Sequence, residues 1–345
     1  MFRRRVISLS ALALLTAASM DAGDWPAFRG PMGDGVVREA VFDANRPIGL
    51  RVAWKRELGS GYSSASVAGD SAVTMFSDGE KDHLIALDRA TGQEIWRLDL
   101  GDTYVGHDGS HTGPVSTPLI ADGRVYALGP RGRLIAAALE NGSELWSVEL
   151  TESAAARKPH YGFGTAPVIA GGVLVVQVGA EEGAIAGLDP ESGEMLWKAG
   201  DDPVSYQSPV QMTVGDRRLV MAVGDKKLRA LDPRDGTLFW EFEHGGGGAR
   251  GAASLVPVLA DDGRVFLAHQ DNASRMLRIG HSEEGVTFTP LWENRAIRNS
   301  YNVAVYHQGF VYAFSSRFLI CVDAETGETA WKSRAPGDGF LILVD

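Results

Sequence analysis

The amino-acid sequence predicts an all-β protein built from repeated four-stranded units, and three observations predict this class. Tryptophan recurs at intervals of 39 to 52 residues between Trp54 and Trp331. Alternating apolar runs joined by Asp-Gly or Gly-Gly pairs precede most of these tryptophans, and such pairs are strong hairpin signals. No helical periodicity competes with this pattern. A period of about 40 to 50 residues with strand-like content is typical of a β-propeller blade.

Each tryptophan closes a shared local motif, Asp-x-x-x-Gly-x-x-x-Trp, which is complete at 88–96, 189–197, 232–240 and 323–331. The Asp carboxylate can accept backbone N–H groups where the turn begins, and Gly supplies the positive φ where it ends. The flat indole then suits packing between neighbouring sheets. Two copies depart from this form: Ala138 replaces the Asp before Trp146, and the turn before Trp292 is longer.

Two hairpins per period make four strands per blade, and radial packing of such blades leaves few exposed edges. The sequence therefore predicts six full blades that end near their tryptophans, namely Trp96, Trp146, Trp197, Trp240, Trp292 and Trp331. A lone tryptophan strand, 51–58, is expected before them, and a lone apolar strand, 340–344, after them. We expect Trp54 to close the last blade by pairing with C-terminal strands.

The repeat units resemble the pyrroloquinoline-quinone (PQQ) type of propeller repeat. The resemblance rests on Ala-Leu-Asp-x-x-x-Gly-x-x-x-Trp at 86–96 and 230–240, with a close variant at 321–331, and it extends from about residue 50 to the C-terminus. The segment 24–35 also looks like the opening segment of exported PQQ-like proteins. The resemblance implies tryptophans docked between blades of an eight-bladed propeller. Quinoprotein alcohol dehydrogenases and the propeller lipoprotein of the outer-membrane β-barrel assembly machinery have this fold.

Six full blades fall short of eight, so we expect an incomplete eight-bladed ring. The chain is either truncated or carries a defective closing blade. An open ring exposes sheet edges and apolar faces, which invites association or instability.

The N-terminus has the pattern of an export signal, with three arginines at 3–5 followed by an apolar run too short to span a bilayer comfortably. We predict a signal peptide at 1–19, an extended segment at 20–48, the propeller at 49–345, and a periplasmic or secreted location. An uncleaved anchor is the alternative, and the export route stays open between the Sec and twin-arginine systems. No later segment approaches 18 apolar residues, so we expect no membrane span after cleavage.

The net charge narrows the possible partners. The net charge of −11 repels phosphate backbones, so we expect no nucleic-acid partner.

Cys321 is the one cysteine and lies in the apolar run 318–322. We expect it to be a small buried hydrophobe rather than a reactive thiol.

In a propeller, the segments that precede the innermost strands meet at one mouth of the central channel. Here these segments carry ten polar or aromatic candidates for ligand or cofactor binding: His107, His111, His160, Tyr161, Tyr206, Gln207, Arg250, Arg298, Asn299 and Tyr301. Such a funnel could hold an anionic or aromatic ligand. The competing interpretation is that polar loops only line a watery channel. The glycines around His107, Asp108 and His111 indicate a loop, so no metal site is predicted there.

Two functions follow from these observations. The first is an exported, non-catalytic scaffold or binding module that holds a protein or a small ligand at its rim or channel mouth. The alternative is a quinoprotein oxidoreductase, for which the resemblance implies PQQ in the channel and Ca²⁺ as a Lewis acid. One cysteine cannot supply that family's vicinal pair, and the sequence contains no Cys-x-x-Cys-His haem motif. We therefore predict no catalytic residues and favour the binding module. A partial gene product is a third possibility.

Overall fold

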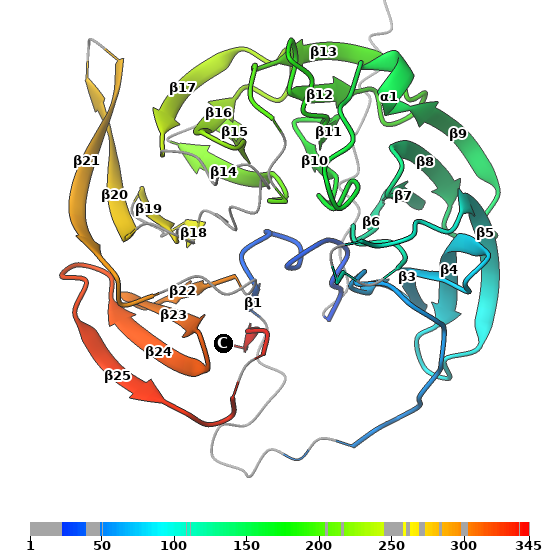
Figure 1. Ribbon diagram of the computed structural model, residues 1–345, viewed down its shortest axis with the longest axis horizontal. Helices are drawn as coiled ribbons and strands as arrows, with labels where there is room; N and C mark the ends of the chain where they lie inside the picture. The colour runs from blue at the N-terminus through cyan, green and yellow to red at the C-terminus, as the bar shows by residue number, and fades with distance from the viewer. Residues whose placement is uncertain are drawn as a thin grey trace, which may run out of the picture.

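The computed structural model of the 345-residue chain confirms the all-β class. The structure describes residues 23–38, 49, 51–107, 109–110, 112–203, 206–214, 217–244, 258–259, 263–268, 273–282, 285–297, 303–337 and 339–344. In these residues, six antiparallel sheets of four strands each pair their strands in chain order. Figure 1 shows these six blades arranged around a common centre, with an opening between the last blade and the first. The predicted four strands per repeat are confirmed.

The blades are numbered along the chain. Blade 1 contains Ser66–Ala68 (β2), Ser71–Ser77 (β3), Lys81–Asp88 (β4) and Glu94–Asp102 (β5); blade 2 contains Leu119–Ala121 (β6), Arg124–Leu128 (β7), Arg133–Ala138 (β8) and Glu144–Glu149 (β9); blade 3 contains Val168–Ala170 (β10), Val173–Gln177 (β11), Ile185–Leu188 (β12) and Met195–Ala199 (β13). Blade 4 contains Val210–Val214 (β14), Arg217–Val223 (β15), Lys227–Leu231 (β16) and Leu238–Glu243 (β17); blade 5 contains Val258–Leu259 (β18), Arg264–Leu267 (β19), Ser274–Ser282 (β20) and Gly285–Asn294 (β21); blade 6 contains Val305–His307 (β22), Phe310–Ser315 (β23), Phe318–Asp323 (β24) and Thr329–Ser333 (β25). A single helical turn, Leu150–Ser153 (α1), follows β9.

The inner hairpins form where the dipeptide signals predict them. Ala121 pairs with Arg124 across a two-residue turn, and both turn residues, Asp122 and Gly123, have positive φ (47° and 72°). Two positive φ values are what a type I′ turn requires, and this turn matches the twist of the flanking strands. Dipeptides containing Gly tolerate this backbone, which explains their recurrence between the apolar runs.

The outer turns of blades 1, 3, 4 and 6 use the predicted Asp and Gly. In blade 5 a longer turn was predicted, but β20 and β21 are longer instead and pair as far as Ser282 and Gly285. In blade 1, Asp88 Oδ1 accepts the backbone N–H of Thr91 at 2.7 Å, and Gly92 has φ +72°. Asp189 and Asp323 accept backbone N–H groups in the same way in blades 3 and 6. In blade 2, where Ala138 replaces the Asp, Asn141 Oδ1 accepts the N–H of Ser143 at 2.9 Å. The residue at the same turn position makes the same contact in blades 1, 3, 4 and 6, so blade 2 keeps this hydrogen bond and lacks only those of the Asp.

The predicted docking of tryptophan between blades is confirmed. Trp96 of blade 1 lies against Gly142 of blade 2, and its indole N–H donates to the carbonyl of Leu139 at 2.7 Å. Four other tryptophans donate similarly to the following turn: Trp54 to Arg89, Trp146 to Pro190, Trp197 to Pro233 and Trp292 to Ala324. The indoles of Trp96, Trp146, Trp197 and Trp292 therefore fix one blade against the next, and that of Trp54 fixes the segment 51–58 against blade 1.

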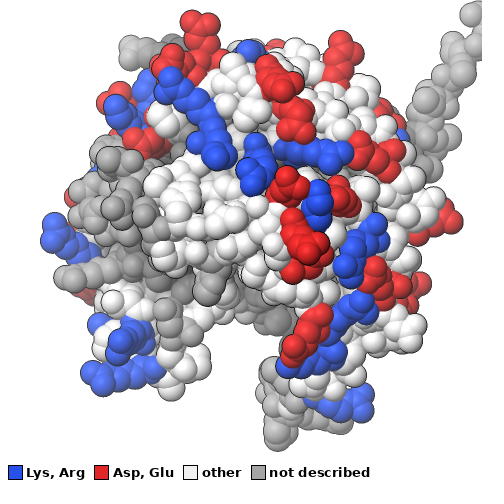
Figure 2. Space-filling view, turned by 45° about the vertical axis from the view of Figure 1, so that its right-hand side comes forward, with Lys and Arg blue, Asp and Glu red and all other residues white. Residues whose placement is uncertain are grey.

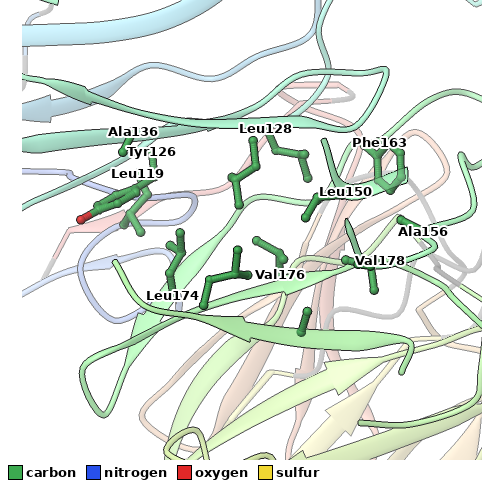
Figure 3. Packing of buried hydrophobic residues seen from close by; sticks show 14 of the residues in the cluster. Leu119, Tyr126, Leu128, Ala136, Leu150, Ala156, Phe163, Leu174, Val176 and Val178 are labelled. Atoms are coloured by element: carbon green, nitrogen blue, oxygen red, sulfur yellow. The ribbon is translucent and has the colours of Figure 1, made fainter. Parts of the chain in front are cut away.

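The hydrophobic core is divided among the blade interfaces. Between blades 2 and 3, Tyr126 and Leu128 on one sheet pack with Leu174 and Val176 on the next, and Phe163 lies in the same buried cluster. Figure 3 shows these side chains meeting between the two sheets. Burial of one such side chain contributes roughly 1.5–3 kcal/mol. The ring is held together by a series of such contacts rather than by one central core.

The two ends of the described chain meet inside the ring, which corrects one expectation. Val36–Val37 (β1) pairs in parallel with Leu343–Val344 (β26), close to the centre in Figure 1. The segment 51–58, predicted as a strand, has no strand assignment. Its Trp54 and Leu58 instead pack against buried Phe76, Ile85 and Leu87 of blade 1. Side-chain docking, and not ladder pairing with C-terminal strands, holds this segment.

Two further expectations concern membrane insertion and the cysteine. Among the described residues, no helix is long and apolar enough to cross a membrane. The predicted signal peptide lies outside the described residues.

Cys321 is buried in blade 6, and burial raises the pKa of its thiol. It is therefore a small buried side chain, as predicted.

Candidate functional site

Three loops that are distant in the sequence bring five rings together, and we call this group the aromatic cluster: Tyr104, His107, His160, Tyr161 and Tyr206. The His107 ring lies edge-on to His160 at a centroid distance of 4.3 Å and is stacked near Tyr161 at 5.6 Å. Tyr161 lies 5.8 Å from Tyr206. Tyr104 lies 6.4 Å from His107. The cluster therefore joins the loops that precede the inner strands of blades 2, 3 and 4.

Backbone contacts hold these loops in register. The Tyr206 hydroxyl accepts the backbone N–H of Tyr161 at 2.6 Å, and the Tyr104 hydroxyl donates to the carbonyl of His160 at 3.2 Å. The backbone N–H of Tyr104 donates to Asp82 Oδ2 at 3.0 Å. Gly164 leaves room for this packing, because a Cβ there would stand 3.0 Å from Val115 and 3.4 Å from the Tyr206 ring. The rings are thus positioned by the scaffold and not only by each other.

The cluster has two cations at its side and neutral phenols within it. Lys158 Nζ and Arg131 Cζ lie 5.9 and 6.0 Å from the centre of the Tyr104 ring, within cation–π range. Arg131 also donates to the carbonyl of Thr103 at 3.1 Å. Burial raises the pKa of Tyr206 to about 12 and also raises the pKa of Tyr104. Both phenols therefore stay protonated at neutral pH.

The outer rings of the cluster face solvent. His107 and His160 are exposed and Tyr161 is half-buried, whereas Tyr104 beneath them is buried. Exposed, pre-positioned Tyr and His rings beside Lys and Arg are suited to stacking and hydrogen bonding with a partner surface or an anionic group. The structure therefore places exposed rings and two cations side by side on one surface.

The charges elsewhere do not form a basic surface on the side shown in Figure 2, where Lys and Arg alternate with Asp and Glu. The outer strands carry many of these residues as pairs, such as Arg97 with Glu94 at 2.9 Å and Arg133 with Glu144 at 2.8 Å. On this side the charges of the outer strands are therefore mixed.

The structure sorts the ten predicted candidates into three groups. It brings His107, His160, Tyr161 and Tyr206 together, and it buries Gln207. The other five lie outside the described residues: His111, Arg250, Arg298, Asn299 and Tyr301. Sequence reasoning missed Tyr104, Arg131 and Lys158. Tyr104 stands three residues before His107, and Lys158 two residues before His160, so a search of whole loops could have found both.

A second feature that the sequence did not reveal is the position of the N-terminal segment 23–37 inside the ring (Figure 1). Trp25 forms an antiparallel bridge with Val67 of blade 1, and Arg29 donates to the carbonyl of Ala304, which precedes β22, at 2.7 Å. Burial lowers the pKa of Arg29 to about 10. The segment therefore connects the first blade with the last across the centre.

A cavity of about 380 Å³ lies between this segment and the inner strands of blades 1 to 4. Its walls are largely apolar, with Phe28, Ile120, Val168 and Val210 among the lining side chains. None of the aromatic-cluster residues lines it. The cavity and the cluster are therefore separate features.

The aromatic cluster does not fit the quinone cofactor that the PQQ-type repeat implies. A planar group between two rings needs them about 7 Å apart, since each stacked contact takes about 3.5 Å. His107 and Tyr161 are 5.6 Å apart, and His160 lies edge-on to both at 4.3 and 4.6 Å. In the described part of the chain, no three His, Cys, Asp or Glu side chains converge to hold a cation. The rings of the cluster therefore pack against one another and leave no gap into which a planar cofactor could insert.

The fold and the site define a class: a β-propeller of PQQ-like repeats whose blades are joined by docked tryptophans and which bears a cluster of aromatic side chains on three of its loops. The family described as outer membrane protein assembly factor BamB matches residues 48–165 and 80–333. The chain belongs to this family.

Individual relatives agree with this assignment. The chain is similar to the outer membrane protein assembly factor BamB of Yersinia pestis, with 23% identity over 342 residues that cover 84% of this chain and 82% of the relative. It is also similar to the quinohemoprotein alcohol dehydrogenase ADH IIB of Pseudomonas putida, with 29% identity, but the match covers 48% of this chain and only 25% of that enzyme. The crystal structure of BamB from Moraxella catarrhalis has a TM-score of 0.54 at 17% identity, covering 78% of this chain and 72% of that one. This structural likeness supports the fold.

Proposed function

We propose that this chain is an exported, non-catalytic scaffold of the bacterial envelope that binds a protein partner through the aromatic cluster and assists outer-membrane protein assembly. The observation that carries the proposal is the convergence of His107, His160 and Tyr161 on an exposed surface whose supporting residues, Tyr104 and Tyr206, are fixed by hydrogen bonds. Rigid aromatic side chains lose little conformational entropy on binding, so they contribute strongly to protein interfaces.

The family supports the same proposal. The matching family and the relative from Yersinia pestis are described as assembly factors of outer membrane proteins. The N-terminal arginines and apolar run are those of an export signal. We infer a periplasmic location, which cell fractionation with an antibody against the mature protein tests directly.

The binding surface is tested by complementation of a deletion strain in the native host. The test variant carries His107→Ala, His160→Ala and Tyr161→Ala together, and the control carries Leu145→Ala and Leu196→Ala, two exposed positions on outer strands. The readout is the amount of folded outer-membrane barrel protein, and circular dichroism checks that each variant folds. We expect the test variant to lose complementation and the control to keep it. Full complementation by a folded test variant would show that the cluster is not the binding surface.

The quinoprotein alternative is tested by titrating the purified protein with PQQ and Ca²⁺ while recording absorbance and the melting temperature. Saturable binding raises the melting temperature through mass action. If such binding occurs and weakens in a His160→Ala variant, the channel mouth is a cofactor site and the scaffold proposal fails. We expect no saturable change.

A further inference from the structure

The N-terminal segment binds the channel-facing edges of two inner strands in succession. Trp25 exchanges two backbone hydrogen bonds with Val67 of β2, at 2.8 and 2.9 Å. The next residue, Pro26, accepts the backbone N–H of Ile120 in β6 at 2.7 Å. One residue of the segment therefore covers the edge of blade 1, and the following residue covers the edge of blade 2.

The segment turns away before it reaches the edge of blade 3. The N–H of Gly30 donates to the carbonyl of Ala27 at 3.0 Å, and Arg29 between them has φ +63°. The cavity of about 380 Å³ is lined by residues of this turn on one side and by Ile169 of β10 and Gln211 of β14 on the other. Its volume lies in the range of small-molecule sites, roughly 300–1,000 Å³.

Ile169 has the same position in blade 3 that Ile120 has in blade 2. Each pairs across its inner hairpin, Ile120 with Val125 and Ile169 with Leu174, one residue before the pair that closes the hairpin. Alternate pairs of an antiparallel ladder exchange no hydrogen bonds, so the N–H and C=O groups of such residues point away from the partner strand. The bond from Ile120 to Pro26 confirms this direction in blade 2. The N–H of Ile169 therefore points toward the channel as well.

The edge at Ile169 is only half satisfied. Its carbonyl accepts the side-chain amide of Gln211 at 2.7 Å, but no group in the described part of the chain accepts its N–H. Ile120, which the segment covers, is 5% exposed, whereas Ile169 is half-buried. The buried Ser208 also lines the cavity; its Oγ accepts the N–H of Ala166 at 2.8 Å, and its hydroxyl hydrogen has no acceptor among the described residues. Two donors at this wall thus lack an acceptor.

The charges around the cavity exclude an anionic ligand. Two carboxylates, Asp24 and Asp122, belong to its lining, and no Lys, Arg or His does among the residues that the structure describes. These carboxylates repel an anion. They do not require a cation either, because Asp24 already pairs with Arg89 at 3.5 Å and Asp122 is exposed to water. The remaining walls are largely apolar, so the ligand that fits is uncharged.

We propose that this cavity binds a small, uncharged, apolar compound whose amide or ester carbonyl accepts the N–H of Ile169. Its carbonyl takes the place at blade 3 that the Pro26 carbonyl has at blade 2. None of the residues of the aromatic cluster lines the cavity, so the two sites can be tested separately.

The probe is N-(para-fluorobenzyl)acetamide, which has an apolar ring, no charge and one amide carbonyl. It is added to the whole protein labelled with ¹⁵N-isoleucine, in which the Ile169 amide resonance is assigned from an Ile169→Val variant. We expect a saturable downfield shift of the Ile169 amide proton, because that N–H gains an acceptor. The Ile120 resonance is the internal control and should change little, since its N–H already bonds to Pro26.

Two matched probes test the chemistry of recognition. In para-fluorobutylbenzene the carbonyl is absent, and in para-fluorophenylpropanoate a carboxylate replaces the amide. Fluorine NMR of each probe measures its affinity. We expect both to bind at least about tenfold more weakly than the acetamide, because one loses the hydrogen bond and the other is repelled by the carboxylates.

A backbone substitution tests the donor itself. Ile169→Pro removes the N–H, and an edge strand tolerates proline where the N–H faces away from the sheet. Ile169→Ala is the matched control, because it shortens the side chain and keeps the N–H. We expect the acetamide to bind at least about tenfold more weakly to the proline variant and to lose less than about threefold with the alanine variant. Circular dichroism checks that both fold.

Three results would overturn the proposal: no saturable shift of Ile169 up to the solubility limit of the acetamide, equal affinities for the three probes, or equal affinities of folded proline and alanine variants. If the proline variant does not fold, the Ile169 resonance and the three probes decide the question on the unmodified protein.

Discussion

The indole of Trp54 lies directly against Gly92, where a Cβ would stand 2.5 Å from Cε3 of the ring, and its N–H donates to the carbonyl of Arg89 at 2.9 Å. Trp54 belongs to a segment with no strand assignment, yet it docks with the same geometry as the tryptophans of regular blades. The dock is therefore specified by the turn that receives the indole and does not require that the tryptophan be part of a sheet.

The first prediction concerns the receiving glycine. Gly193→Ala should lower the free energy of unfolding by about 2–4 kcal/mol, because alanine is strained at φ +74° and its methyl would lie 2.7 Å from the Trp146 ring. Gly172→Ala is the control, since φ is +81° but no atom lies within 4 Å; we expect a loss of about 1 kcal/mol there. Urea denaturation measures both. Equal losses would mean that backbone strain, and not the indole, dominates.

The second prediction compares two tryptophans. Trp197→Ala removes a nearly buried ring and its hydrogen bond to Pro233, and should cost about 3–5 kcal/mol. Trp331→Ala removes a ring that is 44% exposed and should cost less than about 1.5 kcal/mol. Thermal and urea unfolding of the purified variants measure the difference. A loss at Trp331 as large as that at Trp197 would show that the face of blade 6 is already covered.

The contrast between these sites shows what could be predicted from the sequence. The tryptophan spacing and the Asp and Gly of each turn are local sequence patterns, and each is compatible with one local structure. The six blades and the tryptophan contacts between them could therefore be predicted. The contact from Arg29 to the carbonyl of Ala304 spans 275 residues, and a backbone carbonyl leaves no mark in the sequence. The strand expected at 51–58 failed for a similar reason, because its partner strands were inferred from ring closure and not from any local pattern.

The aromatic cluster could be predicted from the sequence only in part. The repeat placed His107, His160, Tyr161 and Tyr206 near one mouth because each precedes an inner strand. The burial of Gln207 and the support from Tyr104 depend on how each loop folds back on itself. Loop conformation is set by contacts between loops, which a single repeat period does not encode.

The third prediction concerns the N-terminal segment inside the ring. Arg29→Ala leaves the carbonyls of Asp34 and Ala304 without their donor and should cost about 1–3 kcal/mol. We expect faster amide hydrogen exchange in β1 and β26, which pair next to this contact. Arg38→Ala is the control, because that arginine forms an exposed ion pair with Asp34 and should contribute at most about 1 kcal/mol. Unchanged exchange in the Arg29 variant would show that the segment is held by other contacts.

The fourth prediction is a pH dependence that comes from the turn aspartates. The hydrogen bond from the Arg234 side chain lowers the pKa of Asp232 to about 2, from an ordinary value of 3.8. Hydrogen bonds in their own turns also lower the pKa values of Asp88, Asp189 and Asp323. A carboxyl with a lower pKa in the folded state binds fewer protons there than in the unfolded state. Its contribution to stability is therefore complete above pH 3.8 and is lost as the pH falls through the folded-state pKa.

This dependence can be isolated with two substitutions of Asp232. Asp232→Asn keeps an oxygen that can accept the N–H of Arg234 but cannot ionise, so its urea midpoint should fall less steeply than that of the wild type between pH 4 and pH 2. Asp232→Ala removes the acceptor as well, so it should be less stable than Asp232→Asn at every pH, including pH 2, where the charge no longer contributes fully. If the wild type and Asp232→Asn lose stability in parallel over this range, other carboxylates govern acid unfolding, and the turn contributes through its backbone geometry alone.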